Sequence, residues 1–214
     1  TLGAGASVST PTAITLTDTA ANDTFTNTTG TISATSSGSI TGYGISGGTT
    51  GGSDTIGGTT YDVKKVGTYG TLYVKSSDGS YVYVPNATAV NAVSANQSET
   101  FSVQATDSNG TGSATLTINV TGVNDTPTLT APTAGSYTDT SSSDTFTNTT
   151  GTLAGSDRDT GATLTYGITG GTTGGADNIG GTVYNIKKIG TYGTLYVKSS
   201  DGSYVYVPVD NYVP

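Results

Sequence analysis

Short stretches of alternating apolar and polar residues recur along this chain, and turn-forming residues separate them. The alternation is clearest in residues 71–75 and 80–84, which flank a Ser-Ser-Asp-Gly turn and therefore predict a β-hairpin. Four aliphatic side chains of this hairpin are expected to face the core: Leu72, Val74, Val82 and Val84. The opposite face is then expected to carry Tyr73, Lys75, Tyr81 and Tyr83.

A second hairpin is predicted by residues 101–105 and 114–120, which lie on either side of an Asp-Ser-Asn-Gly turn. Shorter strands are expected at residues 14–16, 24–26, 42–45 and 61–66. No segment shows the period of a helix. About seven short strands in about 115 residues predict an all-β fold, an antiparallel Greek-key β-sandwich.

The chain contains a long internal repeat. A stretch of 22 residues, 64–85, returns as 187–208 with a single change, Ile189 in place of Val66. The spacing of 123 residues suits one β-sandwich domain and is far longer than the period of a solenoid. The predicted organisation is a lead-in at 1–10, a first repeat at 11–126 and a second repeat at 127–214.

The second repeat has no counterpart of residues 99–120, which are expected to form the last two core strands of the first repeat. Three explanations are open. The chain is cut from a longer protein, the second repeat is a short domain in its own right, or a strand from another subunit completes it. The lead-in is the candidate donor strand, because its residues are small and apolar.

Composition narrows the function. The chain has no Cys and no His, which excludes thiolate nucleophiles, Ser–His pairs and the usual zinc sites. Its acidic residues lie mainly in turns rather than paired in apolar surroundings, so we do not expect an enzyme. A formal net charge of −8 argues against nucleic acid as a partner, and no apolar run is long enough for membrane insertion. A chain rich in Thr, Gly and Asn, without Cys or Met, is typical of an extracellular bacterial protein.

Several motifs resemble those of known families. Gly-Thr-Tyr-Gly-Thr-Leu at 67–72, followed by Asp-Gly-Ser-Tyr at 78–81, resembles the VCBS repeats of large bacterial surface adhesins. The second predicted hairpin, followed by Val-Asn-Asp-Thr-Pro at 123–127, resembles the end of a cadherin-type domain and its linker. Ser-Asp-Arg-Asp at 156–159 resembles the Asp-x-Asp calcium motif of such a domain. The resemblance implies tandem Ig-like or cadherin-like sandwiches that act as extenders, with Ca²⁺ stiffening their junctions.

The residues themselves suit calcium, which takes about six to eight oxygen ligands in irregular geometry. Asp157 and Asp159 lie two apart in a loop, so both carboxylates can reach one ion. Asn124 and Asp125 on the linker offer further oxygens, and Glu99 is a candidate from the first repeat. The first repeat has no carboxylate at the position of the Asp-x-Asp loop, so we expect one ion between the repeats.

The leading hypothesis is a structural extender of a bacterial cell-surface adhesin or extracellular matrix fibre, whose partners are neighbouring repeats or subunits. The alternative is a self-assembling extracellular filament subunit, in which a neighbouring subunit completes the second repeat with a strand. A third hypothesis is a carbohydrate-binding module that stacks surface glycans on exposed tyrosines, although the same tyrosines can simply fill a half-buried strand face.

Overall fold

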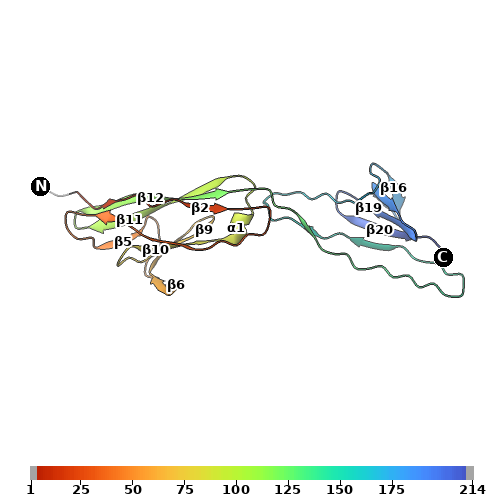
Figure 1. Ribbon diagram of the computed structural model, residues 1–214, viewed down its shortest axis with the longest axis horizontal. Helices are drawn as coiled ribbons and strands as arrows, with labels where there is room; N and C mark the ends of the chain where they lie inside the picture. The colour runs from red at the N-terminus through yellow and green to blue at the C-terminus, as the bar shows by residue number, and fades with distance from the viewer. Residues whose placement is uncertain (1–3, 211–214) are drawn as a thin grey trace. The chain divides into compact units, whose positions relative to one another are not determined.

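The computed structural model describes residues 4–210. With 44% of residues in strands and 2% in a helix, the chain has the predicted all-β fold. The described residues divide into two compact units (Figure 1). The first unit contains the residues up to Thr126 together with Arg158–Thr160, and the second contains Pro127–Asp157 and the residues from Gly161 onward. No helix in the described range is long and apolar enough to cross a membrane.

Two four-stranded sheets form most of the first unit. One is antiparallel, in the order β3 (Thr28–Thr31), β10 (Ser80–Pro85), β9 (Gly70–Val74), β8 (Val63–Val66). The other has the order β2 (Ile14–Thr17), β12 (Gly110–Thr121), β11 (Gln97–Asp107), β5 (Gly42–Ile45). In this second sheet β2 runs parallel to β12, whereas the sequence predicted antiparallel strands throughout.

The hydrophobic core lies between these two sheets, because its buried side chains come from both. The long strands β11 and β12 supply Phe101, Val103, Leu116, Ile118 and Val120. Both strands extend beyond the predicted hairpin, since their pairing continues to Gln97 opposite Val120.

The prediction for the hairpin of β9 and β10 is right for β9 and wrong for β10. The side chains of Tyr81 and Tyr83 lie in the core between the sheets, where the alternation had placed Val82 and Val84; Val82 is also buried, at 1% exposed, but on the opposite face. The strand register explains this, because Tyr83 pairs with Leu72 and directly opposed residues point to the same face. The two tyrosines are therefore not an exposed platform, since only 7% and 0% of their surfaces are accessible.

Smaller elements complete the first unit. Part of the lead-in forms β1 (Ser7–Val8), which pairs with β4 (Ala34–Thr35), so the candidate donor strand is packed on the first unit here. Strands β6 (Asp54–Ile56) and β7 (Thr59–Tyr61) form a hairpin. The sequence missed the helix α1 (Ala87–Asn91), because five residues are too few to show a helical period. No strand forms at the predicted residues 24–26.

The second unit repeats the first antiparallel sheet, in the order β14 (Thr149–Thr152), β20 (Ser203–Pro208), β19 (Gly193–Val197), β18 (Ile186–Ile189). Its other strands form two pairs, β13 (Thr128–Leu129) with β15 (Gly155–Ser156), and β16 (Asp177–Ile179) with β17 (Thr182–Tyr184). Within the described part of this unit, no strands correspond to β11 and β12. Residues 165–168 correspond to β5 but form no strand, because β5 pairs with β11 and that neighbour is missing here.

Candidate metal site

Two aspartates lie where neighbouring strands of the second sheet end. Asp18 follows β2 directly, and Asp125 lies four residues beyond the end of β12. These strands run parallel with Thr17 opposite Thr121, so the chain leaves both of them at the same edge of the sheet. The N–H of Asp18 also donates to the Thr121 carbonyl, at 2.9 Å, which fixes the backbone next to the carboxylate.

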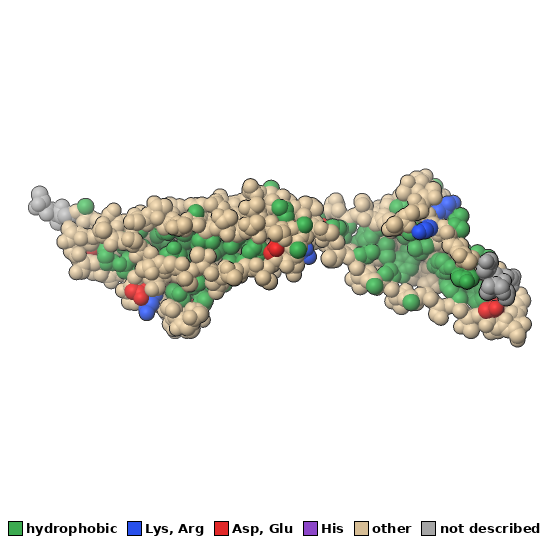
Figure 2. Space-filling view, viewed as in Figure 1, with side chains coloured by type: hydrophobic (Ala, Val, Ile, Leu, Met, Phe, Trp, Pro, Cys, Tyr) green, Lys and Arg blue, Asp and Glu red, His purple; other side chains and the backbone are tan. Residues whose placement is uncertain are grey.

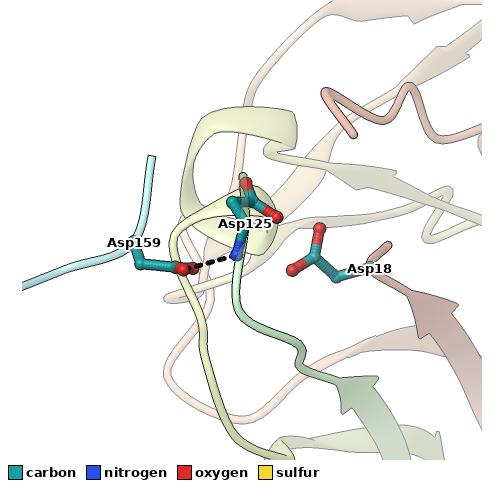
Figure 3. Close-up of side chains that lie close together, drawn as sticks. All are labelled: Asp18, Asp125 and Asp159. Carbon is teal, nitrogen blue, oxygen red and sulfur yellow. Dashed lines mark hydrogen bonds between the residues drawn. The ribbon is translucent and has the colours of Figure 1, made fainter. Parts of the chain in front are cut away.

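A third aspartate, Asp159, comes from the segment Arg158–Thr160, which belongs to the first unit although the residues on either side of it belong to the second. The N–H of Thr160 donates to the Ala92 carbonyl at 2.9 Å, and the N–H of Asp125 donates to Asp159 Oδ2 at 2.6 Å. The three side chains point toward one another (Figure 3). One carboxylate oxygen from each lies within 4.8 Å of the others.

All three carboxylates are buried, with exposed fractions of 1% for Asp18, 0% for Asp125 and 7% for Asp159. Both carboxylate oxygens of Asp18 and Oδ1 of Asp125 lack a hydrogen-bond partner among the described residues. Burial first, and then the negative charge of Asp125, raise the pKa of Asp18 to about 6. Burying carboxylates in this way is costly, so the cluster favours the addition of positive charge.

One cation of the protein reaches the cluster. Arg158 Nε donates to Asp125 Oδ2 at 2.8 Å, and its Nη2 donates to the Ala20 carbonyl at 3.4 Å. Three ionised carboxylates and one guanidinium sum to two negative charges. A bound divalent cation would neutralise that sum.

Asp107 is another buried aspartate of the first unit, and hydrogen bonds from the protein stabilise its carboxylate. It is 5% exposed, and its carboxylate accepts hydrogen bonds from the hydroxyl of Ser36 and from the N–H groups of Asn109 and Gly110. These bonds, that of Ser36 foremost, lower the pKa of Asp107. Asp18 is buried more deeply and shows the opposite shift, because burial and the neighbouring carboxylates outweigh an interaction with the Val123 backbone that lowers its pKa. The cluster therefore differs from an ordinary buried carboxylate.

The structure brings together two of the five residues that the sequence predicts as calcium ligands, Asp125 and Asp159. Asp157 is half-buried in the second unit. Asn124 is exposed, and its side-chain amide donates to the Asp125 carbonyl at 3.0 Å. Glu99 is not part of the cluster, because its carboxylate accepts hydrogen bonds from a turn and a tyrosine of the first unit. Ligand roles for these last three residues stay predictions.

Sequence reasoning missed Asp18. The motif Thr17-Asp18-Thr19 recurs as Thr138-Asp139-Thr140, so it marks the repeat without indicating a ligand. An acid directly after an apolar alternation was the available signal, but only the parallel pairing of β2 with β12 places that acid beside Asp125. The counterpart of Asp18 in the second unit, Asp139, is exposed.

Comparisons of this chain with protein-family models, with curated proteins and with solved structures find no match. The resemblance to VCBS and cadherin-type repeats therefore stays a prediction from the motifs. The function of this chain therefore has to be inferred from its residues and their geometry.

Proposed function

We propose that this chain is a calcium-stabilised structural module of a bacterial cell-surface adhesin or extracellular matrix fibre, built from tandem Ig-like Greek-key sandwich repeats. The observation that carries the proposal is the buried cluster of Asp18, Asp125 and Asp159, with its net charge of two negative units. Calcium suits it better than magnesium does, because Mg²⁺ usually keeps several of its waters and these carboxylates are almost inaccessible to solvent.

The site also supports an extender role for the ion. Asp159 lies on Arg158–Thr160, and the chain on both sides of this segment belongs to the second unit. An ion that holds Asp159 would therefore restrict the second unit through its own chain and stiffen the junction. The near-identical stretch forms three strands of the same antiparallel sheet in both units, which suits a repeated building part. The partners would be neighbouring repeats or subunits at an extracellular surface.

Thermal unfolding in millimolar Ca²⁺ and in EDTA tests the metal site. Calcium at about a hundred times its Kd would add about 2.7 kcal/mol to the free energy of unfolding, which raises Tm by roughly 5–15 °C. Asp18→Asn should abolish this response. Asp139→Asn, in the corresponding exposed Thr-Asp-Thr motif, should retain it. The same Tm for the wild type in calcium and in EDTA would refute the site.

Small-angle scattering of the same samples tests the stiffening separately. The distribution of particle dimensions should narrow when calcium is added to the wild type and to Asp139→Asn, and should not change for Asp18→Asn. A rise in Tm without any change in scattering would keep the ion and reject the extender role.

One observation favours the filament hypothesis as a second candidate. The second unit has an open apolar groove, as a subunit that receives a strand requires. Sedimentation velocity across micromolar concentrations tests it, since a filament subunit must form oligomers and a monomer at every concentration would reject it. The carbohydrate hypothesis has no comparable support, because Tyr81 and Tyr83 lie in the core.

A further inference from the structure

The chain has seven basic residues, and Arg158 is the only arginine among them. Figure 2 shows Lys and Arg side chains as scattered spots on this face of the molecule. The four ion pairs that lysines form lie at the surface, with N–O distances of 3.6–3.8 Å. Arg158 Nε instead donates to Asp125 Oδ2 at 2.8 Å, and the Asp125 side chain is 0% exposed. Among the described residues, the ion pair at the metal site is thus the shortest and the most deeply buried.

The guanidinium of Arg158 is fixed by the loops that carry the other aspartates. Its Nη2 donates to the Ala20 carbonyl at 3.4 Å, and the same carbonyl accepts the N–H of Thr126 at 3.1 Å. Ala20 lies two residues after Asp18, and Thr126 directly follows Asp125. Arg158 is therefore part of the site itself and not a surface side chain that happens to lie nearby.

Arg158 does not fill the place of an ion. It engages Oδ2 of Asp125, whereas Oδ1 of the same carboxylate is buried and has no hydrogen-bond partner among the described residues. One oxygen each from Asp18, Asp125 and Asp159 still lies within 4.8 Å of the others. A bound ion would therefore share Asp125 with Arg158.

This shared ligand has an electrostatic consequence. A guanidinium stays protonated at every pH at which proteins fold, so the positive charge of Arg158 permanently opposes a second cation. The repulsion between like charges is stronger at a buried site than in water. With Arg158 the site offers two negative charges instead of three, and calcium affinity depends on the charge count of the ligands.

The segment Arg158–Thr160 also has contacts with the first unit that need no ion. The N–H of Thr160 donates to the Ala92 carbonyl at 2.9 Å, and Asp159 Oδ2 accepts the N–H of Asp125 at 2.6 Å. The ion pair of Arg158 adds to these bonds and neutralises one buried carboxylate. The segment can therefore stay in place when the ion leaves.

We propose, resting on the calcium site inferred above, that Arg158 is an internal counter-ion that regulates this site. It weakens calcium binding to a Kd on the order of 10⁻⁴ M, in the range of extracellular modules, and it keeps the site folded without the ion. The site then fills at millimolar calcium and empties where calcium is scarce. Calcium binding is thereby made reversible without unfolding of the first unit.

Calorimetric titration of the full chain with calcium, together with thermal unfolding in EDTA, tests this role. Arg158→Gln removes the charge and keeps a polar side chain, so its Kd for calcium should fall at least about tenfold. Its Tm in EDTA should fall by roughly 5 °C or more, because Asp125 stays buried without its cation. A purely structural role would weaken calcium binding and lower Tm together, whereas a counter-ion changes the two readouts in opposite directions.

Two further substitutions serve as controls. Arg158→Lys keeps the positive charge, and its Kd should stay within about threefold of the wild-type value. Lys198→Gln removes one positive charge from an exposed ion pair with Asp201, in the second unit, and should not change the Kd. A tighter Kd in Lys198→Gln as well would assign the effect to net charge and overturn the role of Arg158.

The outcomes distinguish this role from the calcium site itself. An unchanged or weaker Kd in Arg158→Gln would overturn the role of Arg158 and keep the site. A wild-type Kd below about 10⁻⁶ M would overturn the role by itself, even if Arg158→Gln does not fold in EDTA. Absence of calcium binding to the wild type and to Arg158→Gln would refute the site, and the role with it.

Discussion

Leu72 and Leu195 are equivalent residues of the two repeats but lie in different environments, so their contributions to stability can be compared within one protein. Leu72 is fully buried in the first unit, whereas Leu195 is half-buried at the groove of the second. Leu72→Ala should lower the free energy of unfolding of the first unit by about 3–4 kcal/mol, because the transfer term and a closed cavity both contribute. Leu195→Ala should cost about 1 kcal/mol, since part of the side chain is already in water and no closed cavity forms.

Hydrogen exchange in increasing denaturant, followed by mass spectrometry, measures each unit separately. Peptides that contain Val66 or Ile189 distinguish the two copies, because β9 and β19 are identical in sequence. Val82→Ala and Val205→Ala are the matched control, since both valines are 1% exposed and should cost the same. Equal losses for Leu72→Ala and Leu195→Ala would show that the second sheet is covered, and would refute the open groove.

Three further predictions follow from single contacts. Tyr83→Phe should cost about 0.5–1.5 kcal/mol in denaturant unfolding because the hydrogen bond to Glu99 is lost, whereas Tyr206→Phe should cost almost nothing. Gly112→Ala places a Cβ 1.8 Å from the Ala6 carbonyl oxygen, so hydrogen exchange at β1 should accelerate; unchanged exchange would contradict the packing. Folding raises the pKa of Asp18 from 3.8 to about 6, so the folded first unit favours the protonated carboxyl group. In EDTA, the free energy of unfolding of this unit should therefore fall by at most about 3 kcal/mol as the pH rises from about 4 to about 7. Asp18→Asn should flatten this pH profile, measured by thermal unfolding; the same slope in the variant would assign the effect to another group.

Local patterns predicted much of the fold, because they depend on residues close in the chain. The alternation and turn at 71–84 correctly placed β9 and β10, and the Asp-Ser-Asn-Gly turn placed β11 and β12. The faces of β10 were wrong because its register against β9 makes Tyr83, rather than Val84, the partner of Leu72. Nothing in the alternation itself distinguishes the two choices, since tyrosine and valine are both common in strands.

Two of the three residues of the candidate site were predictable, and the third was not, for a related reason. Asp125 and Asp159 follow from short motifs, in which the type and spacing of the residues indicate the chemistry. Asp18 enters through the parallel pairing of strands about a hundred residues apart, which leaves no local signal. Glu99 was predicted as a ligand from the first repeat, yet its carboxylate accepts hydrogen bonds from a turn and holds that turn against the hairpin. Its acceptor role depends on β11 crossing that turn, which also becomes apparent only in the fold.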